Sequence, residues 1–198
     1  KSWATLDSAG LTRVASELAE GRVTIIPTLV LHETYSRLDD PAVLGSDDVK
    51  SVPDSIVTKW NLPDLKARAG WDEALFVAFR NSRANQDLFL RAFRSAGGRI
   101  VAGTDATNQM LVPGWSLHTE LGLLVNAGLT PEDALETATH NTALLLGADS
   151  LGIIAPGKLA DLVVLKANPL TDIRNTRTVE RVMVRGQLYQ AHSLRSAL

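Results

Sequence analysis

The sequence contains no cysteine, no long hydrophobic run and no large excess of one charge. Without cysteine, disulfide bonds and thiolate metal sites are excluded. No apolar stretch has the length needed to span a bilayer. The formal net charge of −2 gives no general attraction to nucleic acid or to an anionic membrane surface. We therefore expect neither nucleic acid nor a membrane among the partners.

The 198 residues have the composition of a globular protein, with 45% hydrophobic and 21% charged side chains. This length suffices for one domain with a core, or for one domain with a small appendage. The chain begins at Lys1, and its first residues lead directly into an amphipathic helix. We therefore expect it to be a piece of a longer protein.

Residues 99–105 form a short β-branched run that ends in glycine and then in an acidic residue. Ile100 and Val101 predict a buried strand, and Asp105 follows directly after Gly103-Thr104. In α/β folds, chemistry is presented just past the C-terminal end of a strand. Asp105 is therefore the first candidate for a catalytic carboxylate, with a helix N-cap or turn aspartate as the structural alternative.

Helices and strands alternate along most of the chain. Thr130-Pro131-Glu132-Asp133 predicts a helix start with a cap, a first-turn proline and a capping box. The order helix, strand, long insertion, helix, strand, helix, helix indicates the end of a parallel β/α array. Helical periodicity and end signals predict helices over residues 7–21, 71–96, 117–127 and 130–147, and β-branched residues predict a strand over residues 23–26.

The segment from Leu29 to about Gly70 has no regular period. Prolines, glycine and acidic pairs interrupt it, and only short helical pieces are expected, around residues 54–60. A connection of this length inside a compact fold is often a lid over a site. A decorated surface loop is the other interpretation.

The pattern changes after Gly147. Short apolar runs at residues 153–154, 162–165, 182–184 and 188–189 predict a small antiparallel β unit, with Asp161 in a turn where it accepts backbone N–H groups. From Leu151 on, seven Lys and Arg stand against three Asp and Glu, a net charge of +4, which leaves −6 for the rest of a chain of net charge −2. We therefore predict two units, residues 1–150 and residues 151–198.

Several blocks of the sequence resemble the amidohydrolase superfamily, and within it the imidazolonepropionase-like and Xaa-Pro-dipeptidase-like hydrolases. Gly103-Thr104-Asp105-Ala106 is one block, and Ile26-Pro27-Thr28-Leu29 resembles the preceding barrel strand. The resemblance extends over about half of the chain, and its order is the order of the family. The further blocks are residues 113–121, 128–135, 138–147, 151–165, 168–170 and 182–186.

The resemblance implies an α/β protein, in which residues 1–150 are the C-terminal part of a (β/α)8, TIM-like barrel. Residues 151–198 would then belong to a small β-sandwich. It also implies a metal-dependent hydrolase that cleaves amide C–N bonds of dipeptide-like or N-acyl amino-acid substrates. Asp105 matches the family's aspartate at the end of the last barrel strand, which binds the metal and accepts the proton of the metal-activated water.

The resemblance further implies one or two divalent metal ions, with zinc expected. The family's His-x-His pair does not occur in these residues, so the N-terminal remainder of the same enzyme is an expected partner, and a homo-oligomer is compatible with the sequence. Thr28 and His118 are candidates for substrate contact, with capping and packing as their respective alternative roles. A cyclic-amide hydrolase or deaminase of the same superfamily, or a non-catalytic scaffold, remains an alternative function.

Overall fold

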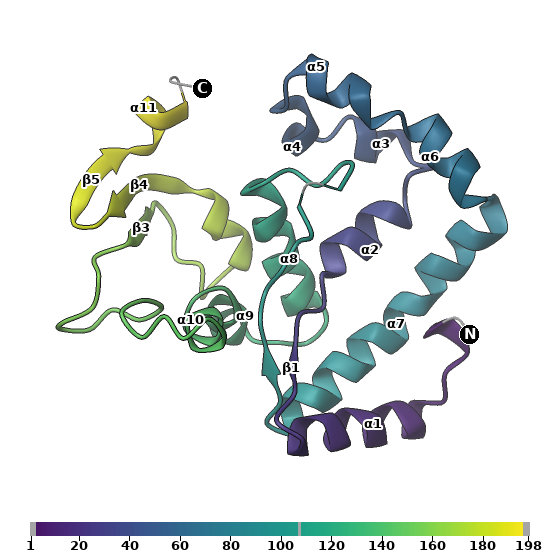
Figure 1. Cartoon of the computed structure of the whole chain (residues 1–198), viewed down its shortest axis with the longest axis horizontal. Helices are drawn as coiled ribbons and strands as arrows, with labels where there is room; N and C mark the ends of the chain where they lie inside the picture. Colours follow the sequence, from purple (N-terminus) through teal and green to yellow (C-terminus); the bar gives the residue numbers. More distant parts are fainter. Residues whose placement is uncertain (1–2, 107, 196–198) are drawn as a thin grey trace.

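The computed structural model describes residues 3–106 and 108–195 as a set of helices around two small sheets (Figure 1). In the first sheet, β1 (Thr24–Ile25) runs parallel to β2 (Arg99–Ile100), with Ile25 opposite Ile100. In the second sheet, three antiparallel strands lie in the order β3-β4-β5. None of the helices in the described ranges has the length and apolar character needed to cross a membrane.

Two long helices pack near the parallel strands β1 and β2. Helix α1 (Ser8–Glu20) begins where the Asp7 carboxylate accepts backbone N–H groups, and it ends at Gly21, as predicted. It packs against the long helix α7 (Glu73–Ser95), which also contacts the short η1 (Trp3–Thr5). Both long helices were predicted, because each has an apolar face of helical period and a clear end signal.

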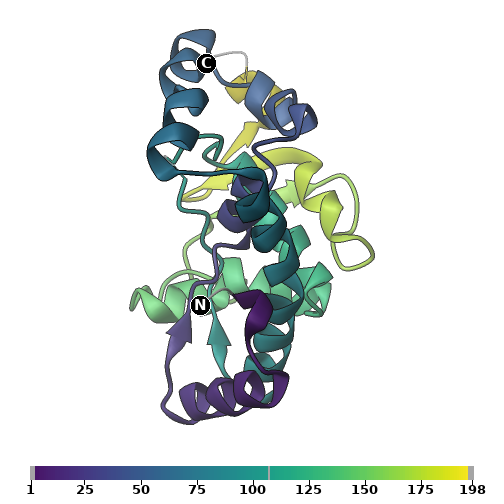
Figure 2. The ribbon, with the colours of Figure 1, turned by 90° about the vertical axis from the view of Figure 1, so that its right-hand side faces the viewer.

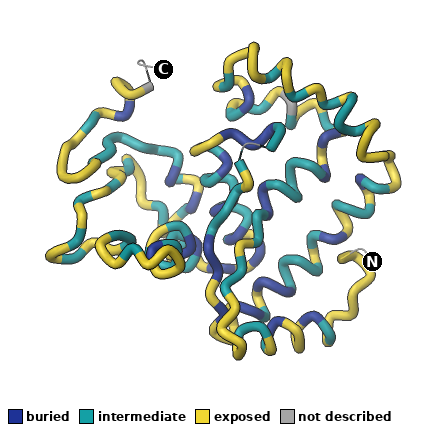
Figure 3. Tube along the Cα trace, viewed as in Figure 1, coloured by how far each residue is buried: buried dark blue, intermediate teal, exposed yellow. Residues whose placement is uncertain are grey.

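The main core lies where these two helices meet the strands and α8 (Trp115–Asn126), as the buried stretches in Figure 3 show. The two strands are parallel, and their C-terminal ends face away from α1 (Figure 1). The buried apolar side chains of this core are Leu11, Ala15, Leu29, Phe89, Leu90, Phe93, Ile100, Leu121, Leu124, Ala127, Leu129, Ala134 and Ile173.

The segment after β1, expected to be mostly irregular, is largely helical. Its pieces lie beyond the C-terminal ends of the strands, the first in the middle of the molecule and the later ones at the far end from α1 (Figures 1 and 2). Helices of four residues have little intrinsic stability, and a second apolar cluster around Leu38, Val49, Phe76 and Met110 holds them. The pieces are α2 (Leu29–Tyr35), α3 (Pro41–Leu44), α4 (Asp47–Lys50), α5 (Asp54–Val57), η2 (Thr58–Trp60) and α6 (Leu62–Ala69).

The helix predicted from Thr130 to Gly147 is two helices, so that prediction is wrong. Helix α9 (Pro131–Ala138) starts with the predicted capping box, but the chain breaks before α10 (His140–Leu145). The break occurs because the Thr137 carbonyl accepts the backbone N–H of Ala102 at 3.0 Å and the hydroxyl of Thr142 at 2.7 Å. That carbonyl therefore bonds to the chain after β2 instead of continuing the helix.

Residues after 151 form the antiparallel sheet of β3 (Leu162–Leu165), β4 (Val179–Val184) and β5 (Gln187–Gln190), with η3 (Ile173–Arg177) and α11 (Ala191–Arg195). The prediction of a strand at residues 153–154 is wrong, because that stretch is a loop in which Ile154 is 87% exposed. Asp161 accepts the backbone N–H of Arg185 at 2.6 Å, as expected.

Candidate functional site

Asp105 lies just past β2, at the end of the sheet to which both parallel strands point. Its backbone is left-handed, with φ of 52°, and its carbonyl accepts both the backbone N–H and the side-chain amide of Asn108. It caps no helix, because the described residues after it form a bridge and a turn. The residue is exposed, and within residues 3–106 and 108–195 its carboxylate has no hydrogen bond or ion pair. The carboxylate is therefore available to a ligand or to water.

Thr28 occupies the corresponding place after β1 and is half-buried. It stands at the N-terminus of α2 with a left-handed backbone (φ 46°), and its hydroxyl makes no capping hydrogen bond. A Cβ built on Gly103 would lie 3.5 Å from Cγ2 of Thr28 and 2.3 Å from Cγ2 of Ile26. Glycine at 103 thus lets the two strand ends approach, and it brings Thr28 close to the chain that leads to Asp105.

Glu120 was not identified from the sequence, although it organises this region. It is fully buried in α8, and its two carboxylate oxygens accept the backbone N–H groups of Leu29 at 3.1 Å and Val30 at 2.7 Å. It thereby caps α2 in place of the Thr28 hydroxyl. Burial raises the pKa of the Glu120 carboxyl to about 7, opposed by these two hydrogen bonds and by the charge of Arg83.

One sequence signal could have identified Glu120. It stands within the mainly apolar run 117–125, with Leu117 three residues before it and Leu124 four residues after it. On a helix these positions share one face, so the pattern places a carboxylate on the apolar side. A carboxylate on such a face requires partners.

Tyr35 connects Asp105 with the second apolar cluster. Its hydroxyl donates a hydrogen bond to Oε1 of Gln109 at 3.2 Å, and its ring lies 5.3 Å from the ring of Trp71. Burial raises the pKa of the Tyr35 hydroxyl, and the negative charge of Asp105 raises it further. The phenol is therefore neutral at pH 7, and it interacts electrostatically with the Asp105 carboxylate.

His118 lies in a different cluster, on α8. Its ring is 6.4 Å from that of Trp115, over which the Arg177 guanidinium also stacks at 5.4 Å. Arg177 forms two hydrogen bonds with the Asp48 carboxylate, at 2.8 and 3.0 Å, and one with the Thr119 hydroxyl. Burial and then the charge of Arg177 lower the pKa of His118, so the imidazole is mainly neutral at pH 7. Its Nδ1 is buried without a hydrogen-bond partner among the described residues.

The part of the chain that the structure describes holds no group of three or more His, Cys, Asp or Glu side chains suited to a metal ion. Asp105 offers a single carboxylate, whereas protein metal sites such as those of zinc use three or four protein ligands. These residues alone therefore do not fit a complete metal site.

Comparison with known proteins gives related sequences over most of the chain. Residues 32–189 match the amidohydrolase family. Imidazolonepropionase of Cereibacter sphaeroides is 39% identical over 161 residues, which cover 78% of this chain and 40% of that protein. Adenine deaminase 1 of Carboxydothermus hydrogenoformans is 27% identical over 118 residues, which cover 58% of this chain and 19% of that protein.

Among solved structures, a Xaa-Pro dipeptidase with methionine bound in its active site matches with a TM-score of 0.52 and 29% sequence identity. The match covers 69% of this chain and 34% of the dipeptidase. The mixed arrangement of helices and strands is therefore similar to that of this group of enzymes. The chain spans less than half the length of each of these three proteins.

Proposed function

Because this chain belongs to the amidohydrolase family, we propose that it forms part of an enzyme that hydrolyses the C–N bond of an amide. The observation that carries the proposal is the exposed Asp105 carboxylate, free of partners among the described residues, just past a parallel strand pair. We propose a dipeptide-like or N-acyl amino-acid substrate, which is supported by the similarity to a Xaa-Pro dipeptidase.

We assign residues 1–150 to the last strands and helices of a (β/α)8 barrel, with β1 and β2 as neighbouring barrel strands. Thr28 and Asp105 then lie at the C-terminal mouth, where such barrels have their active sites. Residues 151–198 are assigned to a β-sandwich, of which β3, β4 and β5 form one sheet. The N-terminal remainder of the same enzyme would complete both units.

In this proposal Asp105 accepts a proton from the attacking water and delivers it to the leaving amine, as a general base and then a general acid. A divalent metal, when bound, lowers the pKa of water toward neutrality. The superfamily generally uses such ions, and zinc is the ion we expect. Asp105 would be one of its ligands. The described residues hold no group of three or more ligands, so the other ligands would come from the N-terminal remainder of the enzyme.

Thr28 and His118 are proposed to contact the substrate. Thr28 is half-buried at the strand end, with a hydroxyl that α2 does not use. The imidazole of His118 is neutral and half-buried, and Nε2, the ring nitrogen other than the buried Nδ1, makes no hydrogen bond with the described residues. A polar group of the substrate could accept or donate a hydrogen bond at either position.

A cyclic-amide hydrolase is the second candidate function, and the 39% identity with an imidazolonepropionase favours it. A deaminase is the third, supported by the similarity to an adenine deaminase. All three reactions attack a C–N centre with water, so Asp105 would have the same role in each. Turnover of a Xaa-Pro dipeptide, an N-acyl amino acid, a cyclic imidazolone and adenine distinguishes them.

The substitution Asp105→Asn tests the proposal, because it removes the base while keeping the size of the side chain. We expect turnover of the preferred substrate in the enzyme that carries this chain to fall by at least about a hundredfold, the usual contribution of general acid–base catalysis. Circular dichroism and the unfolding midpoint should stay unchanged. Asp149→Asn, another exposed loop aspartate, is the matched control with wild-type turnover. Wild-type turnover in Asp105→Asn would reject the assignment.

A further inference from the structure

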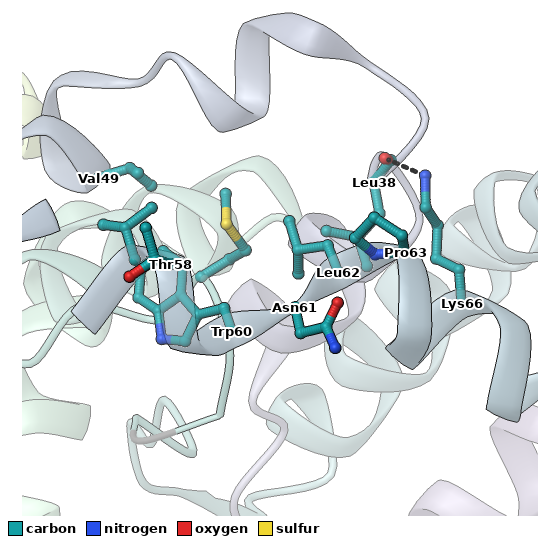
Figure 4. A pocket seen from close by; sticks show the side chains of 10 residues that line it. Leu38, Val49, Thr58, Trp60, Asn61, Leu62, Pro63 and Lys66 are labelled. Carbon is teal, nitrogen blue, oxygen red and sulfur yellow. Dashed lines mark hydrogen bonds between the residues drawn. The ribbon is translucent and has the colours of Figure 1, made fainter. Parts of the chain in front are cut away.

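A cavity of about 430 Å³ lies between helices α4 to α6 and the loop after β2 (Figure 4). Its lining is mainly apolar and includes Leu38, Val49, Trp60, Leu62 and Met110. This volume is in the range of small-molecule sites, about 300 to 1,000 Å³, which are also mostly apolar with a few polar groups.

Lys66 provides a positive charge in the cavity lining. In Figure 4, Leu62 lies between Trp60 and Lys66, whose ammonium is directed toward Leu38. Its Nζ donates a hydrogen bond to the Leu38 carbonyl at 3.2 Å. An ammonium has three donors, so two remain for another acceptor.

No carboxylate in residues 3–106 or 108–195 forms an ion pair with Lys66, although it is half-buried. The other basic side chain of α6, Arg68, is neutralised by Asp64 at 2.8 Å. An ammonium forms its strongest hydrogen bonds with ionised oxygens such as those of a carboxylate. An anion in the cavity would supply such an oxygen beside Lys66.

The cavity and Asp105 share one loop. Met110, which lines the cavity and is 5% exposed, follows Asp105 by five residues. Gln109, between them in sequence, accepts the hydroxyl of Tyr35, which packs against the same apolar cluster. The cavity and the candidate base are therefore served by the same short segment of sequence, the loop after β2.

We propose that this cavity binds the apolar, carboxylate-bearing part of the amide substrate, with its carboxylate on Lys66 and its apolar group against Trp60, Leu62 and Met110. The inference rests on the proposed function, because it takes Asp105 as the reacting end of the site. Such a cavity would favour amides of apolar amino acids that have a free carboxylate over neutral amides. A void left by the packing of short helices is the opposing interpretation.

Equilibrium binding tests the cavity without requiring turnover. The probe is 3-phenylpropionate, and 3-phenylpropan-1-ol is its neutral match. We expect saturable binding of the acid by titration calorimetry, and roughly tenfold weaker binding of the alcohol, the contribution of a charge-assisted contact. Tryptophan fluorescence should respond in the wild type and lose that response in Trp60→Phe, since Trp60 lines the cavity.

Variants of α6 locate the carboxylate. Lys66→Met should bind acid and alcohol equally, Lys66→Arg should keep the preference, and Arg68→Met, on the same helix but outside the cavity lining, should behave as wild type. Equal binding of acid and alcohol by the wild type, or an acid preference that survives in a folded Lys66→Met, overturns the proposal. Asp105→Asn should bind the probe normally, so failure of the proposed reaction would show in turnover and not in this assay.

Discussion

At the scale of single residues, three non-glycine residues around the candidate site have a left-handed backbone conformation. Thr28, Asp105 and Met110 have φ of 46°, 52° and 69°. Each such position is disfavoured, by roughly 1 to 3 kcal/mol, and persists only where its surroundings fix it. For Thr28 the fixing group is Glu120, which binds the next two backbone N–H groups. Strain at the mouth of the sheet is therefore supported by a buried carboxylate on another helix.

Glu120 should make the stability of the chain depend on pH. Its pKa of about 7 in the folded chain is higher than the ordinary 4.5, so between these values the folded chain binds a proton that the unfolded chain releases. The free energy of unfolding should therefore fall as pH rises from about 4.5 to about 7, by up to about 1.4 kcal/mol per pH unit from this group. Urea unfolding at several pH values measures the slope.

Glu120→Gln removes the titrating group, so its slope over this range should be smaller than that of the wild type. Glu136→Gln, at an exposed position of α9, is the control and should keep the wild-type slope. Identical slopes in all three proteins would contradict the role given to Glu120.

At the scale of elements, the sequence predicts those that have both a period and an end signal. The helices α1, α7 and α8 were predicted because their apolar faces repeat over several turns and glycine follows each. The helices between Leu29 and Gly70 were mostly missed because pieces of three to eight residues are too short to show a period. The break at Thr139 was missed because a long-range hydrogen bond to Ala102 produces it.

The start of α9 gives a direct test of one predicted local signal. The Thr130 hydroxyl accepts the N–H of Asp133 at 3.0 Å, so Thr130→Ala leaves that donor without its cap. We expect a loss of about 1 kcal/mol in the free energy of unfolding, measured by urea titration. Thr12→Ala, an exposed position within α1, is the control and should cost almost nothing. An unchanged free energy of unfolding in Thr130→Ala would mean that the capping box adds no stability here.

At the scale of the whole molecule, η3 is tied to the short helices after β1 by a contact between residues 129 positions apart. Arg177 binds the Asp48 carboxylate with two nitrogens while it stacks on Trp115. The two side chains are 33% and 24% exposed, so solvent screens the pair only in part. This bidentate pair connects a segment of residues 151–198 with the helices beside the cavity.

A double-mutant cycle on Arg177→Met and Asp48→Asn should give a coupling of about 1 kcal/mol in the free energy of unfolding, smaller at high salt. The pair Arg174 and Asp172 is the control, because it is local and Arg174 is 84% exposed. Its coupling should be near zero at the same salt concentration. Equal coupling energies for the two pairs would contradict the claim that the Arg177–Asp48 pair stabilises the fold more than a local, exposed pair does.

The candidate site was partly predictable at this same scale. Asp105 and Thr28 were identified because each follows a short β-branched run, and parallel strands bring such ends together. Glu120, Tyr35 and the partners of Arg177 were not identified, because their roles depend on contacts between segments far apart in the chain.

The close fit at Gly103 makes two positions of the chain interdependent. Side-chain bulk at Ile26 occupies the volume that any β-carbon at 103 would need, since that atom would fall 2.3 Å from its Cγ2. A side chain at 103 is therefore blocked while Ile26 keeps its present position. In related sequences, a larger residue at 103 should therefore occur with a smaller or differently oriented side chain at 26, so the two positions should covary.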